Sequence, residues 1–146
     1  MVKKFMLLLP LLLTGCHLAE NHYQKAIDNA HDWAEAYFNN DFHEAESLST
    51  PESGRWLRFA ASNTTQEELD ALPRGGATVV VKEFNQANDT LGVATIEVSN
   101  YVRPTAIGSK PEVADKGLFL IPMVKRDGKW LVRMEGLPRS ERQSRD

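Results

Sequence analysis

The first half of the chain places apolar residues every three or four positions, which is the spacing of one face of an α-helix. One long helix is predicted over 20–39, with Asn21 as its N-cap. An Asn-Asn-Asp run ends this helix, and Asp41 within the run can cap a second, shorter helix through Leu48. The long helix therefore has a single apolar stripe to bury.

Two more helices are predicted before the pattern changes. The third begins with Thr50 as N-cap and Pro51 at the first helical position, where the N–H that proline lacks would have no partner anyway. Thr65 and Glu68 have the spacing of a capping box and begin the fourth helix, which ends near Leu72. The third helix is expected to bury four side chains: Trp56, Leu57, Phe59 and Ala60.

After Gly75 and Gly76 the apolar period falls to two, which is typical of β-strands. Strands are predicted over 77–84, 90–102, 117–125 and 129–135, and a long loop over 103–116. Pro122 inside the third strand indicates an edge position or a bulge. Helices followed by antiparallel strands predict an α+β protein, with N-terminal helices packed on a curved, cone-like antiparallel sheet of about four strands.

The second predicted strand has two different faces. One face carries Ala94, Ile96, Val98 and Val102, and the other carries Val93, Thr95, Glu97, Ser99 and Tyr101. The first face is the more apolar one and is expected to face the core. Glu97 is then expected in solvent or on a face that contacts a second copy of the chain.

The N-terminus has the pattern of a secretory signal peptide. Two lysines precede a nine-residue apolar stretch over 5–13, which is too short to span a bilayer as a helix. The stretch ends in Leu-Thr-Gly-Cys, where Cys16 is the only cysteine in the chain. This segment resembles the lipobox of bacterial lipoproteins. The resemblance implies cleavage between Gly15 and Cys16 and a lipid on the Cys16 thiol, and several acyl chains would anchor the protein firmly.

The chain is accordingly expected to have four parts. Residues 1–15 are the signal peptide, residues 16–21 are the lipidated cysteine and a short tether, residues 22–135 are one α+β domain, and residues 136–146 are a polar, disordered tail. His17 follows the cysteine, instead of the Asp that marks retention at the inner membrane. The expected location is therefore the bacterial cell envelope, anchored to the outer membrane with the domain facing the periplasm.

Composition and charge exclude several classes of protein. The chain has 146 residues, 42% of them hydrophobic, and a net charge of −3. Lys3 and Lys4 are the only charges of the predicted signal, so removing these two positive charges leaves −5. An acidic domain is not expected to bind nucleic acid in general, and no second apolar run is long enough for a multi-pass membrane protein. With Cys16 lipidated, a disulfide within the chain, a cysteine catalyst and a cysteine zinc cluster are excluded.

Four sequence segments resemble the nuclear-transport-factor-two-like superfamily of cystatin-like cones, and in particular small bacterial lipoproteins that carry such a domain. They are Trp-Ala-Glu-Ala-Tyr-Phe over 33–38, Asn-Asp-Phe-His-Glu-Ala over 40–45, Leu-Ser-Thr-Pro-Glu-Ser over 48–53 and the hairpin over 122–132. The resemblance implies a cone with a pocket between sheet and helices, and often a dimer packed through the sheet. It implies no activity.

Few residues suggest catalysis. If the face that carries Glu97 lined the cone, Glu97 and Tyr101 would be candidates for an acid/base pair. His31 on the long helix is a third pocket candidate, although its neighbour Asp32 lies about 100° away around a helix. The four histidines lack the spacing of a metal site, and no glycine-rich phosphate loop or nucleophile elbow is present, so no metal or cofactor is expected.

Three functions remain open from the sequence. The preferred one is a membrane-anchored envelope lipoprotein that binds a small ligand or a protein partner without catalysis. The second is an envelope enzyme, an isomerase or hydrolase, with Glu97 and Tyr101 in the cone. The third is a structural or assembly factor of the envelope. The expected partners are the membrane through the lipid on Cys16, a small ligand or envelope protein, and a second copy of the chain bound through the sheet.

Overall fold

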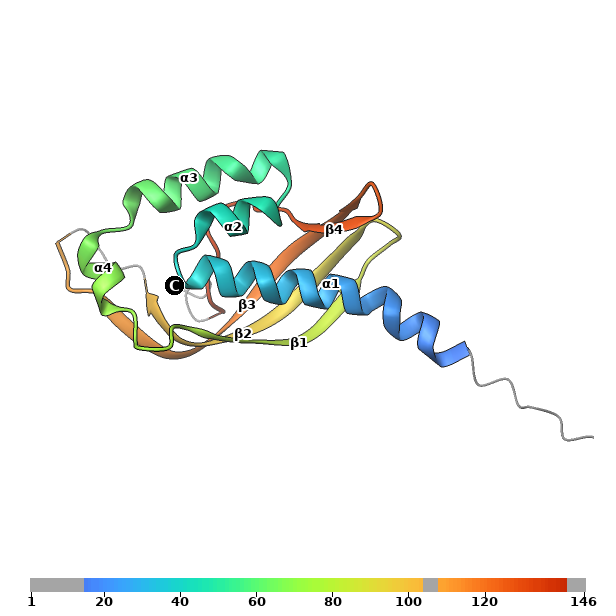
Figure 1. Cartoon of the computed structure of the whole chain (residues 1–146), viewed down its shortest axis with the longest axis horizontal. Coiled ribbons are helices and arrows are strands. Elements are labelled where there is room, and N and C mark those ends of the chain that lie inside the picture. The colour runs from blue at the N-terminus through green and yellow to red at the C-terminus, as the bar shows by residue number, and fades with distance from the viewer. Residues whose placement is uncertain (1–14, 104–107, 142–146) are drawn as a thin grey trace, which may run out of the picture.

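The computed structural model describes residues 15–103 and 108–141, with side chains from residue 23 onward. Helices come first along the chain and four strands follow (Figure 1). The helical elements are α1 Gly15–Phe38, α2 Phe42–Ser47, the 3-10 turn η1 Pro51–Ser53, α3 Gly54–Asn63 and α4 Gln66–Ala71. The strands are β1 Thr78–Gln86, β2 Leu91–Arg103, β3 Glu112–Arg126 and β4 Lys129–Val132.

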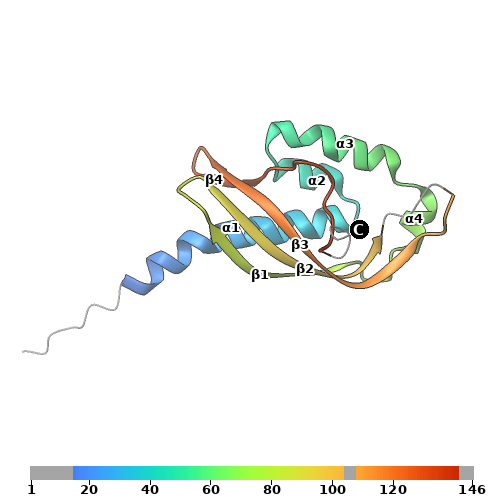
Figure 2. The ribbon, with the colours of Figure 1, turned by 180° about the vertical axis from the view of Figure 1, so that it is seen from behind.

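Helix α1 lies along the concave face of the sheet, with its predicted apolar stripe turned inward (Figures 1 and 2). The side chains of Ala26, Ala30, Trp33 and Ala34 are fully buried. Three of these four residues are alanines, so the helix can approach the sheet closely, and Trp33 fills the wider space at the centre. Burial of this stripe is the main reason why α1 is stable, because isolated helices are marginal in water.

The beginning of α1 differs from the prediction. The helix starts at Gly15, so Asn21 lies within it instead of capping it, and the backbone of the predicted tether over 16–21 is helical. The rest of the predicted signal, residues 1–14, lies outside the described part of the chain. Among the described helices, none combines the length and the apolar character needed to cross a membrane.

The N-caps predicted at Asp41 and Thr65 are both present. Each side chain accepts the backbone N–H of the third residue after it, at 3.1 Å and 3.2 Å respectively. The predicted third helix instead begins with the 3-10 turn η1 and becomes α-helical only at Gly54. The Thr50 hydroxyl does not cap this helix, because it is hydrogen-bonded to Ser53 Oγ at 2.8 Å.

The sheet has the order β1-β2-β3-β4, and every neighbouring pair is antiparallel. The predicted fold class, helices on one face of a curved four-stranded sheet, is confirmed (Figure 2). The loop predicted over 103–116 is wrong at its ends, since Arg103 belongs to β2 and pairs with Glu112, and residues 112–116 belong to β3. Strand β3 therefore starts at Glu112, directly after Pro111, and not at residue 117.

Strand β4 is shorter than predicted and leaves part of β3 without a strand partner. Pairing ends at Val132 and not at residue 135, with one further bond in which Arg133 N donates to Pro122 O at 2.9 Å. In an antiparallel ladder the N and O of one residue point to the same side. The nitrogen of Pro122 therefore faces the side where β4 has ended, which is the edge position predicted for it.

The burial of β2 follows the predicted alternation only as far as Val98. Ala94, Ile96 and Val98 are fully buried as expected, but the next buried residue is Tyr101, which was predicted on the outer face. Asn100 lies between them, is exposed and has a positive φ.

 The φ of Asn100 is 56°, which lies in the left-handed region that asparagine tolerates better than most residues. This single backbone angle turns the strand over, so Tyr101 faces the core and Val102 turns away from it.

The segment after β4 is hydrogen-bonded back to β3 as far as residue 141, which lies within the tail predicted over 136–146. We name residues 133–141 the C-terminal strap. Ser140 forms an antiparallel bridge with Phe119, and Glu141 N donates to Leu118 O at 3.1 Å. The strap thus runs from the end of β4 back to β3, between the helices and the sheet (Figures 1 and 2). Residues 142–146 lie outside the described part of the chain.

Candidate functional site

Two cavities lie between the helices and the sheet, one on each side of the C-terminal strap. The first, which we name the mouth cavity, has a volume of about 920 Å³ and lies between the end of α1, helices α3 and α4, and the far ends of β2 and β3. The second, the strap cavity, has a volume of about 820 Å³ and lies between α1, α3, β3 and the strap. Phe59, Leu137 and Pro138 line both cavities, so they form the partition between them.

The wall of the mouth cavity against the sheet is aromatic. Phe38, Tyr101 and Phe119 form a closed triangle, with ring centroids 4.7 Å, 5.6 Å and 5.4 Å apart. All three pairs are tilted or edge-to-face, which is the favourable geometry for aromatic rings. Such a wall offers a ligand both apolar surface and the negative faces of several rings.

Tyr101 occupies this wall because of two small features of the backbone. The positive φ of Asn100 turns it inward, and Gly117 on the neighbouring strand leaves room for its ring. A Cβ atom at position 117 would overlap the Tyr101 hydroxyl and lie 3.1 Å from the ring of Phe119. Gly117 is therefore required by close packing, and the sequence alone did not indicate this role.

Tyr37 contributes a polar atom to the mouth cavity. Its ring stacks on Trp33, with centroids 5.0 Å apart and an angle of 8° between the planes, and it meets Phe38 and Phe42 edge-on. Burial raises the pKa of the Tyr37 hydroxyl far above its usual value, so this group stays neutral. Among the described residues, none is hydrogen-bonded to this hydroxyl, which leaves it able to bond to a ligand.

The opposite wall and rim of the mouth cavity are polar. Helix α4 and the end of α3 supply hydroxyl and amide side chains together with two carboxylates, Glu67 and Glu68. Lysine, arginine and histidine are absent from the described residues that line it. The electrostatic character of the cavity is therefore negative, which favours neutral or cationic ligands over anionic ones.

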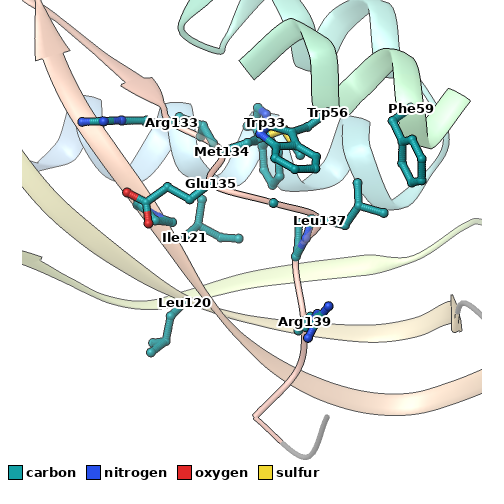
Figure 3. A pocket seen from close by; sticks show the side chains of 14 residues that line it. Trp33, Trp56, Phe59, Leu120, Ile121, Arg133, Met134, Glu135, Leu137 and Arg139 are labelled. Atoms are coloured by element: carbon teal, nitrogen blue, oxygen red, sulfur yellow. The ribbon is translucent and has the colours of Figure 1, made fainter. Parts of the chain in front are cut away.

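The strap cavity has an apolar interior and a different charge. Trp33, Trp56, Ile121, Met134 and Leu137 line it (Figure 3). Phe59, which was predicted to be buried, is 52% exposed because it faces these two hollow spaces instead of a filled core. Among the described residues, the charged side chains that line the strap cavity are two arginines and one glutamate of the strap: Arg133, Glu135 and Arg139.

A buried polar cluster fixes the start of the strap. Ser53 Oγ is fully buried, accepts the backbone N–H of Met134 at 2.8 Å and is bonded to Thr50 Oγ1. On the same turn, Thr50 N donates to Val132 O at 2.8 Å. Ser49 Oγ accepts the indole N–H of Trp33 at 2.8 Å. The Ser-Thr-Pro-Glu-Ser segment therefore connects α1, η1 and the end of β4, a role that we did not predict from its sequence.

The structure separates Glu97 from Tyr101. Glu97 lies on the outer face of the sheet, where its carboxylate oxygens are 3.7 Å from Lys82 Nζ and 3.8 Å from Lys116 Nζ. Tyr101 lies on the inner face, in the wall of the mouth cavity. The acid/base pair on which the enzyme hypothesis depended is therefore not assembled, because Asn100 reverses the strand between its two members.

His31 lies outside both cavities, on the exposed side of α1. The His31 Nδ1 atom is 3.3 Å from Asp32 Oδ1 and 3.8 Å from Glu35 Oε2. The Asp32 carboxylate therefore reaches the His31 ring, although the two residues lie about 100° apart around the helix. The three ligand atoms lie within 4.8 Å of one another, but the two carboxylate side chains are about three-fifths exposed, at 61% and 62%. Exposed charged groups often meet in this way without an ion, and we assign no metal to them.

Comparison with protein-family models and with curated proteins finds no match for this sequence. Among solved structures, the chain is similar to an NTF-2-like protein of unknown function from Shewanella oneidensis MR-1, with a TM-score of 0.51 and 12% identity over 75% of this chain and 92% of that chain. It is also similar to an NTF2-like protein involved in plasmid conjugation, with a TM-score of 0.49 and 13% identity over 82% of this chain and 48% of that chain. The first likeness, together with the helices on a curved four-stranded sheet, shows that this chain has the NTF-2-like α+β cone fold.

Proposed function

We propose that this protein is a lipid-anchored lipoprotein of the bacterial cell envelope whose domain binds a small, largely apolar, neutral or cationic ligand in the mouth cavity. The observation that carries the binding proposal is the mouth cavity itself, about 920 Å³ of space against an aromatic wall. This volume lies in the range of roughly 300 to 1,000 Å³ that is typical of small-molecule sites. An apolar cavity with a few polar groups is also the usual composition of such sites.

The lining residues define the class of ligand. Phe38, Tyr101 and Phe119 offer surface for an apolar or aromatic body, and the Tyr37 hydroxyl offers one hydrogen bond near the wall. Glu67 and Glu68 on the rim repel an anion and attract a cation. The separation of Glu97 from Tyr101 supports binding over acid/base catalysis.

The binding proposal is tested with two matched dyes. N-phenyl-1-naphthylamine is neutral, and 8-anilinonaphthalene-1-sulfonate has the same rings with an added negative charge. Ser62 lines the mouth cavity and Ala61 beside it does not, and both are exposed on α3. We expect Ser62→Trp to block the cavity and weaken binding of the neutral dye at least about tenfold, whereas Ala61→Trp should leave it within about twofold.

Two results would contradict the binding proposal. One is equal binding of the neutral dye by Ser62→Trp and by the unchanged protein. The other is tighter binding of the sulfonated dye at a site that Ser62→Trp blocks. Fluorescence titration measures both dyes, and thermal unfolding of each variant shows whether it is folded.

The anchor is tested separately, because it depends on the sequence and not on the cavities. Cys16 is the only cysteine, so no other thiol of the chain can receive a lipid. We expect Cys16→Ser to abolish incorporation of labelled fatty acid and to release the protein from the membrane fraction. Continued labelling of Cys16→Ser would contradict the proposed lipid attachment.

A further inference from the structure

The strap cavity is built by a departure of the backbone from β3. The strap is bonded to β3 at Arg133 and again at Ser140 and Glu141. In between, the described residues show no backbone hydrogen bond from 134–139 to β3. The strap therefore arches away from the strand instead of extending the sheet, and the space below the arch is about 820 Å³. We name residues 134–139 the arch.

The inside of the arch is apolar. Trp56 lines it, and the guanidinium of Arg55 lies 4.9 Å from the centre of the Trp56 ring. The Trp56 indole nitrogen is buried and has no hydrogen-bond partner among the described residues. The Trp56 ring therefore contributes apolar surface to the cavity wall.

The charged groups of the cavity are also unpaired. Arg133 and Arg139 are exposed and stand on different sides of the cavity (Figure 3). Within the described ranges, neither arginine forms an ion pair with an acidic residue, whereas Arg126 on β3 is paired with Glu52 at 2.8 Å. A single carboxylate, Glu135, lies in the same cavity. Two free guanidinium groups beside an apolar space fit an anionic head group on an apolar body.

We propose that the strap cavity is a second binding site, which takes a free amphiphile with one anionic head group, such as a long-chain carboxylate. The apolar body lies below the arch against Trp56 and Ile121, and the carboxylate is held by Arg139 or Arg133 at the rim. This site is separate from the mouth cavity. The two have opposite charge preferences because, among the described lining residues, the cations lie on the strap side of Leu137 and Pro138. A membrane surface is a different partner, because it would engage the arginines without filling the cavity.

The test uses the full chain carrying Cys16→Ser, which removes the predicted lipid, and the fluorescent fatty acid cis-parinaric acid with its neutral methyl ester. Arg139→Glu is compared with Arg74→Glu, which makes the same charge change at an exposed residue that lines neither cavity. We expect the acid to bind at least about tenfold more tightly than the ester. We expect Arg139→Glu combined with Arg133→Glu to remove that difference, and Arg74→Glu to keep it within about twofold.

A second variant tests the cavity and not the charge. Trp56→Phe keeps an aromatic wall but removes part of its apolar surface, and should weaken binding of the acid and of the ester by the same few-fold factor. Three results would overturn the proposal. They are equal affinity for acid and ester, an acid-to-ester preference that the Arg133→Glu and Arg139→Glu double variant keeps as fully as Arg74→Glu does, and binding to phosphatidylglycerol vesicles without binding of the free acid. Binding of the acid that Ser62→Trp abolishes would also overturn it, because the acid would then occupy the mouth cavity.

Discussion

The two cavities share a wall but are built in different ways. The mouth cavity is formed by regular elements, where a reversed strand places Tyr101 beside Phe38 and Phe119. The strap cavity is formed by an irregular segment that is attached at both ends and arches in between. One curved sheet therefore supports two cavities of different charge, because a short strap divides the space under the helices and brings its own cations. Variants that change only the mouth cavity or only the strap cavity are the best test of whether the strap separates them.

The largest effect is expected at the point where the strap is attached. Ser53→Ala leaves the backbone N–H of Met134 buried without its acceptor, so the free energy of unfolding should fall by about 1 to 3 kcal/mol. Ser47→Ala is the control, because Ser47 is exposed and its hydroxyl bonds only to Glu44 O; it should change stability by less than about 0.5 kcal/mol. Urea unfolding measures both variants. Equal stabilities would mean that Ser53 does not hold the strap.

A comparable loss is expected when the mouth cavity is disturbed through β3. Gly117→Ala introduces a Cβ that overlaps the Tyr101 hydroxyl, and overpacking of this kind costs about 1 to 3 kcal/mol. Gly136→Ala provides the contrast, since a Cβ there has no atom within 4 Å, and it should be neutral or stabilising by up to about 1 kcal/mol. The neutral dye should bind Gly117→Ala more weakly and Gly136→Ala unchanged. Equal stabilities for the two glycine variants would contradict the close packing at Gly117.

Much of this fold could be predicted because its signals are local. The caps at Asp41 and Thr65, the α1 stripe and the buried face of β2 each depend on residues a few positions apart. The face on which Tyr101 lies depended on the φ of Asn100, which alternation alone does not reveal. An asparagine inside a strand was the one available signal, because asparagine adopts positive φ more readily than most residues.

The cavities could not be predicted, for two physical reasons. Ser140 pairs with Phe119 across a long stretch of chain, and the polar composition of the last residues is the same for a bonded strap as for a free tail. Side chains that line a hollow are also of the same types that fill a core. Phe59 has the helical spacing of a core residue and yet faces open space on both sides of the strap.

A smaller effect is expected from opening the partition itself. Leu137 is half-buried and lines both cavities, so Leu137→Ala should cost about 1 to 2 kcal/mol, below the 2 to 5 kcal/mol for a fully buried leucine. The more specific result is a loss of selectivity, in which the neutral dye and the fatty acid begin to compete for one joined space. Leu69→Ala on α4 is the control, since Leu69 is exposed and lines neither cavity. Independent binding of the two probes in Leu137→Ala would show that Leu137 is not the partition.

The smallest effect, and the most specific to the mouth cavity, is expected at Tyr37. Burial holds its pKa above the ordinary value of 10.0, so above pH 10 the unfolded chain loses this proton while the folded chain keeps it. Stability should therefore fall with rising pH by up to ~1.4 kcal/mol per pH unit in that range, and below pH 10 this contribution is fully present. Tyr37→Phe should be less sensitive to alkaline pH than the unchanged protein, and Tyr23→Phe, at an exposed tyrosine, is the control.

Tyr37→Phe should also bind the neutral dye only a few-fold more weakly at pH 7, because one hydrogen bond is lost and the aromatic wall remains. Identical pH dependence of unfolding in Tyr37→Phe and Tyr23→Phe would contradict the burial of this hydroxyl in the mouth cavity.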